Sequence, residues 1–243
     1  MCLITFAWQV IPGRPLIAVA NRDEFLDRPT AAAGWWSDFP QVFAGRDLQG
    51  GGTWMGITRD GRFAAITNVR APDEQRTDVR SRGELVSDFL TGTISSEEYV
   101  ARLAAQADDY NGFNLLVGDC HQLRWFSNRA ADDARNGQPI LPGIYGLSNA
   151  KLDSPWPKVV RSKAEFASLL CQGASDEAFF EMLTDTRLAT DCRLPKTGLS
   201  IELERALSAV CIHTPGYGTR ASTIVRLDTA DNASLNERII LQH

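Results

Sequence analysis

The stretch MCLITFAWQVIPGRPLIAVANRDEF, residues 1–25, decides the fold. Residues 2–11 and 15–20 are apolar at both alternating positions, which is typical of strands that are covered on both faces. The Pro-Gly-Arg-Pro sequence at 12–15 predicts a turn between them. We therefore expect an antiparallel hairpin that lies inside the molecule, with further layers on either side.

Similar strand pairs recur along the chain. WMGIT at 54–58 and FAAITN at 63–68 are joined by a turn that contains Asp-Gly, a strong hairpin signal. Two more pairs are expected at 113–119 with 121–127, and at 221–228 with 235–242.

Helices are predicted in the intervals between these hairpins. Ser95 and Glu98 form a capping box, and Pro157 suits a first helical position. The expected helices cover 84–90, 95–106, 157–170, 176–183 and 201–207. Consecutive hairpins with helices in two groups indicate an α+β fold with stacked antiparallel sheets and helices outside. Since no repeat, low-complexity tract or linker interrupts the pattern, we expect one domain over residues 1–243.

Composition excludes several classes of function. The chain has 25 Lys and Arg against 30 Asp and Glu, a net charge of −5, and no basic stripe, so a nucleic-acid platform is not expected. The apolar run 2–11 lacks a basic flank and contains Thr5 and Gln9, which argues against a signal peptide or a membrane span. The five cysteines are odd in number and include no C-x-x-C pair or metal-site spacing. They predict reduced thiols, a cytoplasmic location and no bound metal.

One cysteine stands directly after the initiator methionine. If the first turn is centred on residues 13–14, antiparallel partners place Cys2 opposite residues 23–26. Arg22 and Asp23 would then lie beside the Cys2 thiol. A thiol next to an Arg/Asp pair is a candidate nucleophile.

The position of Cys2 adds a second argument. A methionine that precedes a small residue is normally removed, which would leave a free α-amine on Cys2 itself. An α-amine has a pKa of about 7.7 to 8.0, so it can accept the thiol proton near neutral pH. Arg22 would favour the thiolate, and Asp23 would hold Arg22 or the α-ammonium. The alternative is that Cys2 is a small buried apolar residue.

Six motifs in one order give the chain a resemblance to a known family. They are MCLITFAW (1–8), ANRDEFLDRPT (20–30), GGGTWMGI (50–57), ITNVR (66–70), YGLSN with WPK (145–158) and YGTRAST (217–223). Together they resemble the NRDE family, also called the transport and Golgi organisation protein 2 family. The matched motifs span nearly the whole chain.

The resemblance implies a four-layer αββα sandwich of the N-terminal-nucleophile hydrolase type, related to penicillin V acylases and bile salt hydrolases. In those enzymes an N-terminal cysteine attacks a linear amide. Carried over, Cys2 matches the nucleophile and Asp23 the aspartate that orients the α-amine. Asn68 resembles the asparagine that donates to the oxyanion, Asn149 a second polar asparagine, and Arg220 a late arginine.

Each partner also has a simpler interpretation. The acylases separate their early arginine and aspartate by two residues, whereas Arg22 and Asp23 are adjacent, so the role of Arg22 stays open. Asn68 and Asn149 close strand-like runs, where asparagine often serves a turn. Arg220 would then pair with a surface carboxylate.

Three hypotheses about function follow. The first is an amidohydrolase that acts on a small-molecule amide through Cys2 and requires no cofactor. The second is a non-catalytic carrier of an apolar ligand: the resemblance implies haem or lipid (acyl-CoA) handling, and the haem ligand would be His121, His213, His243 or a cysteine. The third, a purely structural protein, ranks last, and the oligomeric state stays open. We expect loops 25–50 and 128–143 to shape the pocket.

Overall fold

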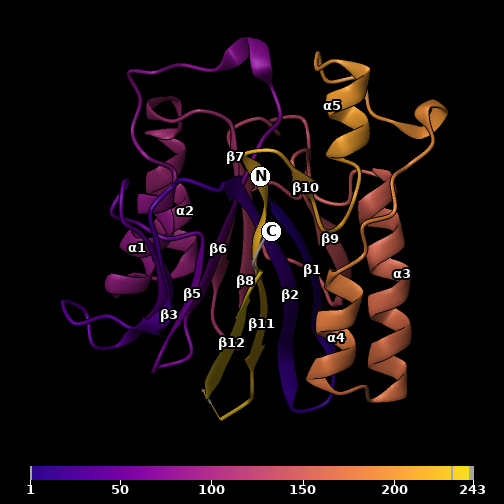
Figure 1. Ribbon diagram of the computed structural model, residues 1–243. Coiled ribbons are helices and arrows are strands. Elements are labelled where there is room, and N and C mark those ends of the chain that lie inside the picture. Colours follow the sequence, from indigo (N-terminus) through magenta and orange to yellow (C-terminus); the bar gives the residue numbers. More distant parts are fainter. Residues whose placement is uncertain (1, 231, 241–243) are drawn as a thin grey trace.

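Two six-stranded antiparallel sheets lie face to face between two groups of helices (Figure 1). This arrangement confirms the predicted α+β class and the four-layer αββα sandwich. The computed structural model describes residues 2–230 and 232–240.

The first sheet contains the predicted N-terminal hairpin at its centre. Its order is β10-β11-β2-β1-β9, and β12 pairs with β11. Its strands are β1 (Cys2–Ile11), β2 (Arg14–Phe25), β9 (Gly143–Leu147), β10 (His213–Thr214), β11 (Tyr217–Leu227) and β12 (Ala233–Ile239).

The second sheet is a meander in the order β3-β4-β5-β6-β7-β8. Its strands are β3 (Thr30–Trp35), β4 (Val42–Asp47), β5 (Met55–Thr58), β6 (Phe63–Asn68), β7 (Phe113–Gly118) and β8 (Leu123–Ser127). The sequence predicted β5 to β8 but did not predict β3, β4, β9 or β10.

Helices cover the outer face of each sheet (Figure 1). α1 (Gly83–Thr91) and α2 (Ser96–Ala104) pack on the second sheet, and α3 (Pro157–Gln172) and α4 (Asp176–Leu183) pack on the first. The predicted cap is present at α2, where the Glu98 N–H donates to Ser95 Oγ at 3.1 Å. α5 (Ile201–Ala206) completes the set of α-helices among the described residues, and none of these helices is both long and apolar enough to span a membrane.

The alternating directions of side chains along β1 explain why apolar residues occupy positions on both faces of that strand. Ile4, Phe6 and Trp8 point into the core between the sheets. Leu3 and Ala7 point the other way, into the core under α3 and α4. Because successive side chains of a strand face opposite sides, a strand in a middle layer needs apolar residues at both. A third core lies under α1 and α2.

The register of the first hairpin differs from the prediction. Cys2 lies opposite Arg22, not opposite residues 23–26. The turn is tighter than expected, since Ile11 already pairs with Arg14, and a register shift between Trp8 and Ile11 moves the remaining pairs by one residue. Both effects bring Cys2 directly beside Arg22.

Candidate functional site

A cleft of about 780 Å³ lies at the end of the sandwich where β1 begins. Cys2, residues 22–25 of β2, Trp54 and Asn68 line it. One wall is formed by residues 69–83, which we call the rim segment and which arches over this end of the molecule (Figure 1). The cleft therefore brings residues that are far apart in sequence around Cys2.

Cys2 is held at the start of β1 by main-chain contacts. Its backbone pairs with Arg22, and Ser148 Oγ lies 3.0 Å from its carbonyl oxygen. Burial raises the pKa of the Cys2 thiol, and the charge of Asp23 raises it further, whereas Arg22 opposes this effect. The thiol therefore stays protonated near neutral pH until a base removes its proton.

Arg22 lies over an aromatic ring. Its guanidinium lies 4.2 Å from the centroid of the Trp54 ring, and Nη1 donates to Thr30 Oγ1 at 3.3 Å. The Glu24 carboxylate is 4.0 Å away. Burial lowers the pKa of Arg22, although guanidinium keeps its charge throughout the ordinary pH range. Arg22 thus places a fixed positive charge next to Cys2.

Asp23 is buried and receives a hydrogen bond from the neighbouring strand. Thr219 pairs with Asp23 in the sheet, and its hydroxyl donates to Asp23 Oδ1 at 2.7 Å. The Thr219 oxygen in turn accepts the Ile212 N–H at 2.8 Å. Burial raises the pKa of Asp23, whereas the positive charge of Lys158 and the Thr219 hydrogen bond lower it.

Lys158 belongs to this site, although its motif suggested no role for it. It stands in the first turn of α3 with only 1% of its surface exposed, and its Nζ has no hydrogen-bond partner among the described residues. Burial lowers its pKa to about 8, against the attraction of Asp23 and Cys2. The WPK motif and the predicted helix start were the available signals, but neither shows that this side chain points inward.

Asn68 and Asn149 are hydrogen-bonded neighbours with different surroundings. Asn68 ends β6 and lines the cleft. Asn149 Nδ2 donates to the backbone oxygen of Asn68 at 2.8 Å, so Asn149 braces the end of β6. Ser148 Oγ lies 3.2 Å from Asn149 Oδ1 as well as close to the Cys2 carbonyl, and it can donate to one of them at a time. This network fixes Asn68 relative to Cys2.

Arg220 is placed differently from the other predicted site residues. It stands at a register shift in β11, and its Nη1 donates to the Phe25 carbonyl at 3.1 Å and to the Arg28 carbonyl. It lines a smaller cavity of about 300 Å³ together with Arg22. Arg220 therefore braces the chain that leaves β2, and it lines this smaller cavity rather than the cleft at Cys2.

The expectation about pocket loops was half correct. Residues 25–50 contribute to the cleft, but they contain β3 and β4 rather than one loop. The expectation for residues 128–143 was wrong, because these residues are absent from the described lining of the cleft.

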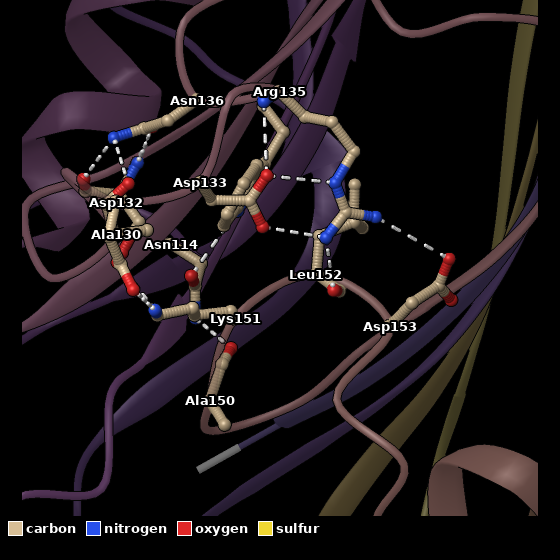
Figure 2. Close-up of polar contacts among 12 residues, drawn as sticks. Asn114, Ala130, Asp132, Asp133, Arg135, Asn136, Ala150, Lys151, Leu152 and Asp153 are labelled. Carbon is tan, nitrogen blue, oxygen red and sulfur yellow. Dashed lines mark hydrogen bonds and ion pairs between the residues drawn. The ribbon is translucent and has the colours of Figure 1, made fainter.

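Backbone hydrogen bonds join the loop 128–143 to β8, an edge strand whose unpaired backbone N–H and C=O groups need hydrogen-bond partners. Figure 2 shows Arg135 bound to Asp133 and to the Leu152 carbonyl, and the second contact ties the loop to the segment that follows β9.

Comparisons with known proteins agree with this fold. The chain is similar in structure to a Caenorhabditis elegans N-acylethanolamine-hydrolyzing acid amidase ortholog, with a TM-score of 0.52 and 10% identity over 99% of this chain and 100% of that chain. At this identity the likeness shows a shared fold.

Sequence relatives are much more similar. The Transport and Golgi organization protein 2 homolog of Bos taurus is 34% identical over 262 residues, covering 99% of this chain and 94% of that protein. The human homolog is also 34% identical, over 264 residues and with the same coverage. The model of the family described as Transport and Golgi organisation 2 matches residues 1–242. The chain therefore belongs to the Transport and Golgi organisation 2 family.

Proposed function

We propose that the protein is an N-terminal cysteine hydrolase of small linear amides, with Cys2 as nucleophile after removal of Met1. The observation that carries the proposal is the convergence of Cys2, Arg22, Asp23 and Asn68 on one cleft. The fold shared with a solved amidase supports it.

The reaction begins with proton transfer from the Cys2 thiol to the α-amine of the same residue. The thiolate then attacks the amide carbonyl carbon, the C–N bond breaks, and the leaving amine takes the proton from the α-ammonium. Water next attacks the thioester, giving up one proton to the α-amine, and the acid leaves as the thiol re-forms. Asp23 holds the α-ammonium, and Arg22 favours the thiolate at each step at which it forms.

Asn68 would supply a hydrogen bond to the oxyanion of each tetrahedral intermediate. It lines the cleft, and no other described residue makes a hydrogen bond to its side-chain amide. One such donor contributes about 10²- to 10³-fold in rate. Asn149 and Ser148 act as positioning residues, since they hold the backbone of Asn68 and Cys2.

The carrier hypothesis fits the cleft less well. An apolar cargo needs an apolar lining, whereas arginines recur along this cleft. Among the described lining residues, Cys2 and Tyr217 are the side-chain types that ligate haem iron, and neither His121 nor His213 takes part. We therefore favour hydrolysis.

The test is hydrolysis of a panel of N-acyl amino acids and N-acylethanolamines, followed by mass spectrometry of the released acid. Wild type should hydrolyse at least one of them, and Cys2→Ala should not. Cys171→Ala is the matched control, because Cys171 is an exposed thiol on α3, and it should behave as wild type. Hydrolysis by Cys2→Ala at the wild-type rate would refute the proposal, and so would inactivity of a wild-type sample that has lost Met1.

A further inference from the structure

Six arginines line the cleft, although the chain as a whole has a net charge of −5. They are Arg22, Arg28, Arg70, Arg76, Arg80 and Arg82. The carboxylates among the lining residues are Asp23, Glu24 and Asp47. The cleft therefore has a local excess of positive charge in an acidic protein.

Three of the six arginines are neutralised by close ion pairs. These are Arg28 with Asp47 at 2.7 Å, Arg70 with Glu204 at 2.5 Å, and Arg80 with Glu84 at 2.5 Å. A substrate anion would gain little from these three, because their charge is already balanced.

Arg76 and Arg82 are different, since their guanidinium groups donate to backbone carbonyls. Arg82 Nη1 donates to the Gly112 oxygen at 3.1 Å, and Arg76 Nη2 donates to the oxygens of Asp108 and Tyr110 at 2.5 and 3.0 Å. Among the described residues, no carboxylate forms an ion pair with either guanidinium. These contacts hold both side chains in place, and no carboxylate of the described residues forms a close ion pair that would neutralise them.

The location of Arg82 makes it the stronger binding residue. Arg82 is partly buried, whereas Arg76 is exposed on the outer part of the rim segment. Arg82 lines the same cleft as Cys2 and Glu24, and the charges of both act on it. A guanidinium in a partly buried site attracts an anion more strongly than one in bulk water, and its planar shape matches carboxylate and phosphate.

We propose that the cleft selects substrates that carry a carboxylate or phosphate group, which Arg82 binds with Arg76 assisting at the outer rim. The hydrolysis of such substrates rests on the proposed function, but their binding does not. The substrate class is thus an anionic amide.

The first test measures binding without any reaction, in Cys2→Ala protein. N-octanoylglycine should raise the Tm, and its neutral counterpart N-octanoylglycinamide should raise it much less, because ligands that bind the folded state stabilise it. Arg82→Gln should weaken N-octanoylglycine binding by about tenfold, as expected for loss of one charge contact at a partly buried site. Arg82→Lys should retain part of the effect, and Arg14→Gln, in the distant β1–β2 turn, should retain all of it.

A second test uses the reactivity of Cys2 in wild type. Iodoacetate is an anion and iodoacetamide is neutral, so the ratio of their alkylation rates should be higher in the folded protein than in the urea-unfolded chain. About 0.5 M NaCl should lower this ratio in the folded protein, because salt screens the attraction. The salt series needs no variant and so stays informative if Arg82→Gln does not fold.

The outcomes separate the two proposals. Equal binding of the glycine and glycinamide compounds, or unchanged binding in folded Arg82→Gln, would overturn the inference about anions, whatever the protein hydrolyses. Selective binding of N-octanoylglycine without hydrolysis would support the inference and count against the proposed reaction. N-octanoyl phosphoethanolamine distinguishes the two anions, because a larger Tm shift than that with N-octanoylglycine identifies phosphate as the preferred group.

Discussion

The buried lysine of α3 should make the stability of the protein depend on pH in the alkaline range. Burial lowers the pKa of Lys158 to about 8 in the folded state, whereas its ordinary value is 10.5. Between these two pH values the unfolded chain holds a proton at this position that the folded protein has lost. The free energy of unfolding therefore rises with pH in this window, as far as Lys158 is concerned.

The magnitude follows from the difference between the two pKa values. It corresponds to about 3 kcal/mol over the whole window, with a slope of at most about 1.4 kcal/mol per pH unit. Other groups act in the opposite direction, since burial raises the pKa of Tyr99 and Tyr217 and so lowers stability above about pH 10. A variant that differs from wild type at Lys158 alone removes this background.

The assay is urea unfolding of wild type and Lys158→Met from pH 7 to 10.5, followed by tryptophan fluorescence. The difference in unfolding free energy, wild type minus variant, should rise by about 3 kcal/mol between pH 8 and 10.5. Lys163→Met is the control on the same helix, because Lys163 is partly exposed and pairs with Asp153 at 2.6 Å. A difference that stays flat for Lys158→Met, or that rises equally for Lys163→Met, would refute the reasoning.

Three shorter predictions concern the residues around the cleft. Asn68→Ala should lower kcat by about 10²- to 10³-fold with little change in KM, because its hydrogen bond forms with the oxyanion. A rise in KM with an unchanged kcat would argue against this role. Glu204→Gln should lower the free energy of unfolding by about 3 to 5 kcal/mol in urea titrations, since it leaves Arg70 buried and unpaired. Thr219→Val should raise the pKa of Asp23, so the acid limb of the pH–rate profile should move to higher pH, whereas an unmoved limb would contradict the assignment.

The sequence predicted those parts of the fold that follow a strong periodic or turn signal. The N-terminal hairpin and the α2 cap are examples. β3 was missed because Thr30–Trp35 is half exposed and consists mainly of alanine and glycine, so it shows no alternation and Thr30 is its one β-branched residue. The register of Cys2 was missed by one position or more, because a local bulge leaves no mark in a largely apolar strand.

The candidate site was predictable to the extent that its residues are neighbours in sequence or in the first hairpin. Arg22 and Asp23 could be placed near Cys2 in this way. The brace formed by Ser148 and the inward position of Lys158 could not, because both depend on how separate elements pack together. Sequence patterns indicate single elements, whereas these features depend on how β1, α3 and the segment after β9 pack together.

The central claim is that Cys2 acts as an N-terminal nucleophile, and intact-mass analysis combined with alkylation kinetics tests it most directly. The mass of the isolated protein shows whether Met1 has been removed, and peptide mapping after a short exposure to iodoacetamide identifies the thiol that reacts first. Our account predicts a mass without Met1 and a Cys2 that is alkylated faster near neutral pH than it is in the unfolded chain. A fully retained Met1, or a Cys2 that reacts no faster than in the unfolded chain, would contradict it.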